Sequence, residues 1–113
     1  MAHFYIQLGE VRIAALRALS KIYSDQSFIP NLELFTGHFK DRMIGCVLDK
    51  ETNVAVEAIN LVTILAQYEG ILTEEDTETV YNLMSDSNCR IRHAVSEFVR
   101  MQLLETAAEG IKG

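Results

Sequence analysis

The chain has 113 residues, of which 49% are hydrophobic and only one is proline, so its composition suits one folded domain and excludes an intrinsically disordered chain. It lacks an apolar run long enough to cross a membrane, a signal peptide and enough cysteines for a disulfide framework, so we expect a soluble intracellular protein. The net charge of −6 is concentrated in residues 51–86, where eight acidic residues and no basic one argue against DNA binding.

The first predicted helix covers residues 11–23 and follows an N-terminal stretch, 1–8, that we expect to be flexible. Its apolar residues fall at the i, i+4, i+7, i+8 spacing of one helical face. A helix this apolar is expected to lie between neighbours rather than on an outer face. The residues of this face are Val11, Ala15, Ala18, Leu19 and Ile22, and Ile13, Ala14 and Leu16 widen it.

A second helix is predicted over residues 30–48, because Pro30 suits a first helical position. Gly37 weakens it by about 0.8 to 1.0 kcal/mol relative to alanine. The apolar stripe that we expect to face the core consists of Leu32, Phe35, Phe39, Met43, Cys46 and Val47.

Three more elements follow the polar hinge 49–53. A third helix is predicted over residues 53–68, and Gly70 is its natural stop. Thr73 caps a fourth helix that runs to about residue 86, with Asp76 three positions on in a variant of the capping box. The fifth helix covers about residues 89–107, and residues 108–113 should be flexible. Its inner seam is predicted to be Ile91, Val95, Phe98, Val99, Gln102 and Leu103.

Three of these helices share a pattern, seen in GEVRIAALRAL, TNVAVEAINLV and CRIRHAVSEFV. Their offsets of 43 and 37 residues are near the roughly 40 to 47 of HEAT and armadillo repeats. The small residues Ala15, Ala58 and Ala94 would let neighbouring helices approach closely. We therefore predict an all-α, HEAT-like domain of about five helices over residues 1–113, as a segment of a longer α-solenoid. A free-standing helical bundle is the alternative.

Few residues point to chemistry. Cys89 and His93 lie at i, i+4, but they lack an orienting acid or a second ligand pair, so a cap and a surface residue are the simpler interpretation. Glu74, Glu75 and Asp76 could suggest a cation site, although their place in the first turn of a helix is explained by the helix dipole. The chain has no phosphate loop or nucleophile elbow. We expect no enzyme, no cofactor, no metal and no small-molecule substrate.

Segments GEVRIAALRAL, NLELFTGHFKDRM and LDKETNVAVEAINLVT resemble the conserved domain of the stromalin, or stromal antigen, subunits of cohesin. The resemblance covers about residues 9–104. It implies a HEAT-repeat solenoid in the nucleus, at the chromosome and centromere, acting in sister-chromatid cohesion. The implied partners are the kleisin, other cohesin subunits and cohesion regulators that carry short aromatic motifs.

The resemblance places a partner-binding surface at His38, Phe39, Lys40 and Arg42. The family usually has arginine where this chain has His38, and a tryptophan upstream of Gly9 that this chain lacks. Both differences favour weaker binding of aromatic motifs. The periodicity alone assigns Phe39 to the core and the neighbouring charges to a solvated helix face, so both interpretations remain open.

Two alternatives of other classes remain. One is a purely structural repeat. The other is a nucleic-acid-binding solenoid segment, in which the candidate DNA contacts are the basic residues of the first and last helices, Arg12, Arg17, Lys21, Arg90, Arg92 and Arg100.

Overall fold

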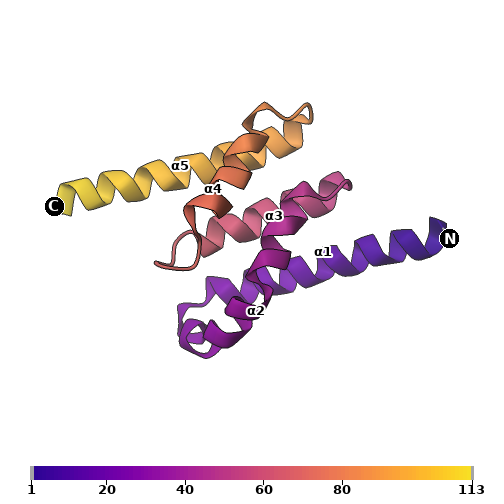
Figure 1. Ribbon diagram of the computed structural model, residues 1–113, viewed down its shortest axis with the longest axis horizontal. Coiled ribbons are helices and arrows are strands. Elements are labelled where there is room, and N and C mark those ends of the chain that lie inside the picture. The colour runs from indigo at the N-terminus through magenta and orange to yellow at the C-terminus, as the bar shows by residue number, and fades with distance from the viewer. Residues whose placement is uncertain (1, 113) are drawn as a thin grey trace.

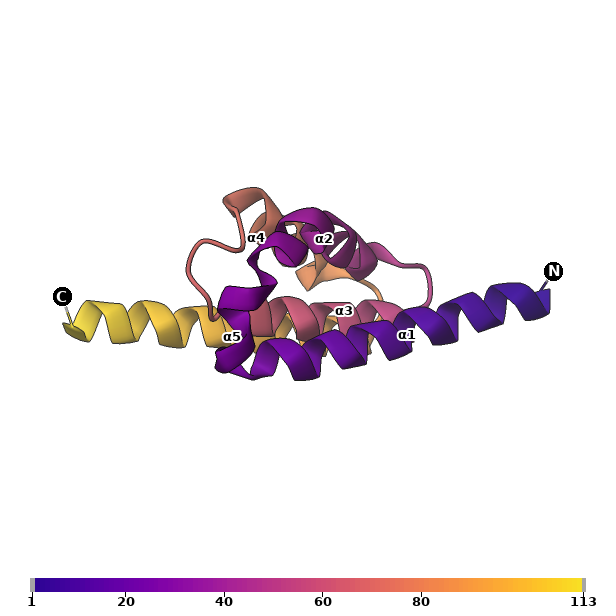
Figure 2. The same ribbon diagram turned by 90° about the horizontal axis from the view of Figure 1, so that it is seen from below.

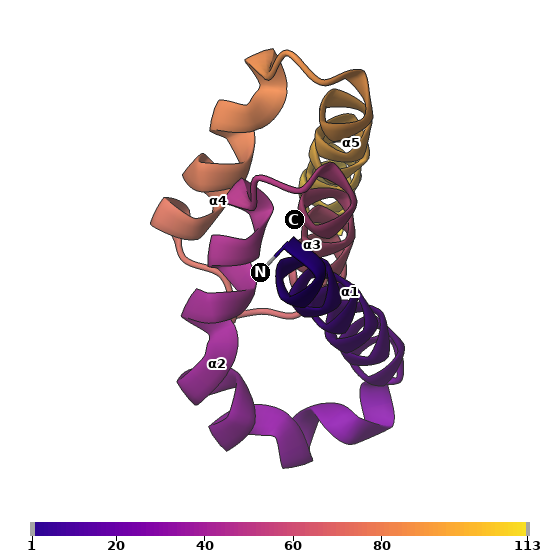
Figure 3. The ribbon, with the colours of Figure 1, turned by 90° about the vertical axis from the view of Figure 1, so that its right-hand side faces the viewer.

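Five α-helices form two layers in the computed structural model, which describes the backbone of residues 2–112 and the side chains of residues 9–108 and 110. The first layer consists of α1 (Ala2–Ser24), α3 (Thr52–Leu65) and α5 (Cys89–Lys112), which run in the same direction with α3 in the middle (Figure 1). Figures 2 and 3 show α2 (Glu33–Gly45) and α4 (Glu74–Tyr81) in the second layer.

Three short 3-10 helices complete the chain. They are η1 (Gln26–Leu32), η2 (Cys46–Leu48) and η3 (Asn82–Ser85). Residues 2–112 contain no β-strand, which confirms the all-α prediction. The three helices that share the repeated pattern are the three of the first layer.

The core is built around α3, whose inward residues are completely buried. Helix α3 lies between α1 and α5, and α2 covers it from the second layer, so apolar residues are needed on most of its circumference (Figure 3). Ala58 and Ala94 are buried, as their predicted role at close helix contacts requires. The side chains of α3 with no exposed surface are Val54, Ala55, Ala58, Ile59, Leu61, Val62 and Leu65.

The predicted inner face of α1 is only partly right. Leu16 is buried and Ile13 and Leu19 pack against the core, but Val11 is 63% exposed and Ala15 is also exposed. Helix α1 is at an edge of the first layer, so only the side that faces α3 is covered within the described chain (Figure 3). The helix also begins at Ala2, earlier than expected.

The predicted core stripe of α2 is only partly right: Met43 and Val47 are buried and Leu32 and Cys46 pack against the core, but the two phenylalanines do not. Phe35 and Phe39 are 37% and 39% exposed, while Thr36, Met43 and Ile44 are buried. The hydroxyl groups of Thr36 and Tyr23 are hydrogen-bonded, and this bond offsets the cost of burying a polar threonine. The buried face of α2 is therefore turned relative to the expected stripe.

Some predicted boundaries also differ. Pro30 lies inside η1, and α2 begins only at Glu33. Leu103 of the expected α5 seam is 65% exposed. The expected flexibility of residues 1–8 and 108–113 stays a prediction: Met1 and Gly113 lie outside the described residues, and the other residues of both ends belong to α1 and α5.

Candidate functional site

A hollow of about 160 Å³ lies between α1 and α2, and we call it the α1–α2 groove. Its floor is apolar, with contributions from Leu16 and Leu19 of α1, Met43 of α2 and Cys46 of η2. Ala15 supplies a small side chain at its α1 wall, which keeps the groove open. An apolar floor without charged groups suits an apolar or aromatic side chain of a partner.

An aromatic pair forms the α2 wall of the groove. The rings of Phe35 and Phe39 have centroids 4.7 Å apart and planes tilted by 36°. The guanidinium carbon of Arg42 is 5.9 Å from the Phe39 centroid, which is within cation–π range. His38 precedes Phe39 on the helix, with ring centroids 6.3 Å apart, and lies four positions before Arg42 on the same helix face. Because Phe39 is 39% exposed beside these side chains, its exposure agrees with the surface expected from the resemblance rather than with the core interpretation. Its role in partner binding stays a prediction.

Arg12 closes one end of the groove and is held in place by Asp49. Its Nε is 3.0 Å from Asp49 Oδ2, in an ion pair that is not aligned for a hydrogen bond, and its Nη2 donates to Oδ1 at 3.4 Å. Asp49 also accepts a hydrogen bond from the Glu51 amide at 2.8 Å, so one carboxylate fixes the arginine and the hinge. Burial raises the pKa of the Cys46 thiol, Asp49 raises it further and Arg12 lowers it.

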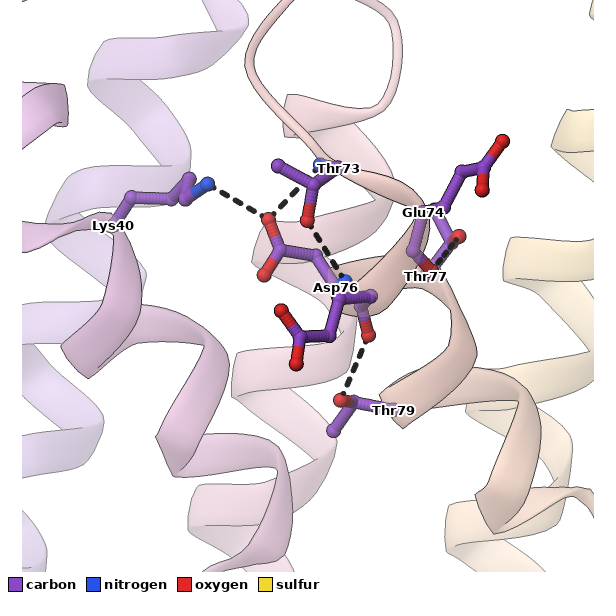
Figure 4. A network of polar contacts seen from close by, with 7 residues as sticks. Lys40, Thr73, Glu74, Asp76, Thr77 and Thr79 are labelled. Atoms are coloured by element: carbon purple, nitrogen blue, oxygen red, sulfur yellow. Dashed lines mark hydrogen bonds and ion pairs between the residues drawn. The ribbon is translucent and has the colours of Figure 1, made fainter.

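Lys40 points away from the groove. Its Nζ lies 2.8 Å from Asp76 Oδ2 at the start of α4, and the lysine side chain is only 19% exposed (Figure 4). The neighbours His38, Phe39 and Arg42 are exposed on another face of α2. The structure therefore brings three of the four predicted partner-binding residues together and separates Lys40 from them. A partner contact by Lys40 stays a prediction that its geometry does not favour.

The capping box predicted at the start of α4 is confirmed. The Asp76 amide donates to Thr73 Oγ1 at 3.1 Å, and the Thr73 amide donates to Asp76 Oδ2 at 3.0 Å (Figure 4). Glu74 and Glu75 occupy the first turn, where the helix dipole favours carboxylates. Residues 2–112 hold no group of three potential ligands close enough for a metal ion, as far as their side chains are described.

The candidate DNA contacts do not form one basic stripe. Arg17 Nε is bonded to Glu57 at 3.1 Å, and Arg92 donates to the Asp86 carbonyl at 2.7 Å. Arg12 is paired with Asp49, as described above. Lys21 on α1 and Arg90 on α5 are exposed, but α3 lies between their helices (Figure 1).

Cys89 and His93 line a shallow hollow of about 470 Å³ between α3 and α5, together with Asn60 and Glu97. Cys89 is an exposed free thiol at the first position of α5. Asn88 caps this helix, since its Oδ1 accepts from the Arg90 amide at 2.9 Å. The residue that caps α5 is therefore Asn88 and not Cys89.

The periodic stripe misplaced Phe35, which lies in the wall of the groove. It was expected in the core together with Phe39, because both fit one periodic stripe. The fold buries Thr36 and Ile44 in addition to Met43 and Val47 of the predicted stripe, so the buried face is displaced toward the side of Thr36. Because the two phenylalanines are four residues apart on one helix, their rings lie side by side.

No protein-family model matches the chain. The chain is 42% identical over 107 residues to cohesin subunit SA-3 of Rattus norvegicus, 47% over 96 residues to cohesin subunit SA-1 of Xenopus laevis and 29% over 102 residues to cohesin subunit scc-3 of Caenorhabditis elegans. These matches cover 92%, 84% and 89% of this chain but only 8%, 8% and 9% of the relatives. No helix in the described part of the chain has the length and apolar character needed to span a membrane.

Proposed function

Because this chain belongs over most of its length to the SA, or stromalin, family of cohesin subunits, we propose that it is a protein-docking module that binds a short aromatic motif in the α1–α2 groove. The observation that carries this proposal is the exposure of Phe39 and Phe35 beside an apolar hollow, with Arg42 next to them. A partner ring can stack on Phe39, and a neighbouring carboxylate can pair with Arg42.

The wider role follows from the relatives. SA-1, SA-3 and scc-3 are cohesin subunits, and this chain matches a segment of about 8% of their length. We therefore propose that the chain works within a cohesin regulatory subunit in sister-chromatid cohesion, at the chromosome in the nucleus. Its partners are then the kleisin and other cohesin subunits, together with regulators that carry the aromatic motif.

The test is a titration of the 113-residue chain with a fluorescein-labelled peptide that carries one phenylalanine next to glutamate. We expect saturable binding that Phe39→Ala weakens about tenfold or more, since buried aromatic anchors dominate small interfaces. Replacing the peptide phenylalanine with alanine should have a similar effect. Fluorescence anisotropy measures both, and circular dichroism checks that the variant keeps its helices.

Leu34→Ala is the matched control, because Leu34 lies on the same helix, is 83% exposed and does not line the groove. This variant should bind the peptide like the parent chain. If Phe39→Ala and the parent chain bound the phenylalanine peptide with equal affinity, the proposal would be wrong.

His38 is expected to make the binding weaker than that of relatives with arginine at this position. Imidazole lacks the two-pronged geometry with which guanidinium holds a carboxylate. In the same titration, His38→Arg should therefore increase the affinity for the glutamate-containing peptide. An unchanged affinity would show that His38 does not contact the peptide.

A further inference from the structure

A second and larger hollow, of about 520 Å³, lies on another side of α2, between η1 and the chain that connects α3 to α4. We call it the α2–α4 hollow. Ile29 and Pro30 of η1 and Ile71 of the connection give it apolar walls. It shares no lining residue with the α1–α2 groove, so one helix presents two separate concave surfaces.

Three carboxylates line this hollow. Glu33 and Asp41 come from one face of α2, and Glu69 comes from the connection between α3 and α4. All three residues are exposed, and none has an ion-pair or hydrogen-bond partner among the described side chains. The single basic residue of the lining, Lys40, is already neutralised by Asp76 at 2.8 Å. The hollow is therefore negatively charged, and its three carboxylates have no basic partner among the described residues.

The spacing of the carboxylates favours an extended cationic ligand over a metal ion. Glu33 and Asp41 are eight positions apart on a helix, a distance of about 12 Å along its axis. The described residues contain no group of three ligands close enough for one ion. An extended peptide advances about 3.3 Å per residue, so two of its residues four positions apart span the same distance and point to the same side.

We propose that the α2–α4 hollow docks an extended peptide segment of the form cation-x-aliphatic-x-cation from a partner protein. One lysine or arginine side chain pairs with Glu33 and the other with Asp41, and Glu69 adds to the negative charge of the hollow. The aliphatic side chain between them also faces the hollow and contacts Ile29, Pro30 and Ile71. Charge complementarity selects this segment, because a negative hollow with apolar walls repels an acidic one.

The test uses fluorescein-labelled Ala-Arg-Ala-Leu-Ala-Arg-Ala and the 113-residue chain, with anisotropy measured at low and high salt. We expect saturable binding that weakens with salt, because the contacts are exposed ion pairs. A peptide with the two arginines adjacent and one with glutamates in their place should bind about tenfold more weakly or not at all. Equal binding of the spaced and adjacent arginine peptides would overturn the proposal.

Two triple variants separate a built site from general charge attraction. Neutralising the hollow with Glu33→Gln, Asp41→Asn and Glu69→Gln should weaken binding about tenfold or more. The control neutralises three exposed carboxylates elsewhere, with Glu10→Gln, Glu75→Gln and Glu78→Gln, and has the same net charge. Equal losses in both variants would overturn the proposal.

A third variant fills the hollow without a change of charge. A Cβ added at Gly37 meets no atom within 4 Å, so Gly37→Leu is compatible with the helix and places its side chain at the lining of the hollow. We expect it to abolish binding of the arginine peptide, whereas Phe39→Ala should leave that binding unchanged. Unimpaired binding by Gly37→Leu would show that the peptide does not bind in this hollow. This outcome is independent of whether the α1–α2 groove binds an aromatic motif.

Discussion

The ion pair between Lys40 and Asp76 joins the two helices of the second layer. The Asp76 carboxylate accepts from the Lys40 ammonium and from the Thr73 amide, and its side chain is only 12% exposed (Figure 4). Burial alone would raise the pKa of Asp76, but the lysine and the Thr73 hydrogen bonds outweigh it, so the net pKa lies below the ordinary value of 3.8. Its charged form is thus favoured by the fold.

This shift makes stability depend on pH. The contribution of Asp76 is fully present above pH 3.8, the ordinary value, and is lost as the pH falls through the lower pKa of the folded state. Asp76→Asn keeps the shape but removes the charge, so we expect a loss of about 1–3 kcal/mol in the free energy of unfolding at pH 7. Urea titrations between pH 7 and 3 should show this difference shrinking below pH 4.

Glu78→Gln provides the control, since Glu78 is an exposed carboxylate on the same helix. It should change the free energy of unfolding by a few tenths of a kcal/mol at most. A difference between Asp76→Asn and the parent chain that stays constant down to pH 3 would contradict the role assigned to the charge.

At the scale of elements, α2 contains an internal glycine, Gly37, whose backbone freedom the fold does not require. A Cβ at Gly37 would meet no atom within 4 Å, and its backbone is helical. Gly37→Ala should therefore raise the free energy of unfolding by about 0.5–1 kcal/mol, because alanine loses less backbone freedom on folding. Chemical denaturation measures the change.

Gly70 is the opposite case. It also has open space around its Cβ position, but its φ of +84° lies in the left-handed region. Gly70→Ala should lower the free energy of unfolding by about 1 kcal/mol. If both alanine variants shifted stability in the same direction, backbone conformation would not be the cause.

The helices and their caps could be predicted because they depend on local chemistry. The Thr73–Asp76 box and the buried seam at Ile91, Val95 and Phe98 follow from sequence spacing alone. The face of α2 that is buried could not be predicted in full. The burial of Thr36 depends on its hydrogen bond to the hydroxyl of Tyr23, which belongs to another helix, α1.

The candidate site was predictable only in part, for the same reason. The resemblance located Phe39 and Arg42 correctly on one exposed surface, but it also included Lys40, whose partner Asp76 lies 36 positions further along the chain. Phe35 was missed because an apolar residue at a periodic position looks the same whether the helix turns it inward or toward a groove. Tertiary contacts decide between the two.

At the scale of the whole molecule, the first layer has two uncovered edges. On α1, Val11 and Ile22 are 63% and 38% exposed, and on α5, Leu103 and Leu104 are 65% and 53% exposed. Helices α1 and α5 lie on opposite sides of α3, and the C-terminal half of α5 extends beyond it (Figure 1). Contact between the α1 edge of one copy and the α5 edge of another would be head-to-tail, so it need not stop at a dimer.

We therefore expect the 113-residue chain to self-associate progressively as its concentration rises. Leu103→Gln with Leu104→Gln should shift this association to concentrations about tenfold higher or more, since burying one leucine contributes about 1.5–3 kcal/mol. Sedimentation velocity over a concentration series measures the average mass. Leu34→Gln removes a leucine of α2 that is 83% exposed and lies away from both edges, and it should leave the association unchanged. A chain that sediments as a monomer throughout would show that the exposed edges are too small or too separate to bind each other.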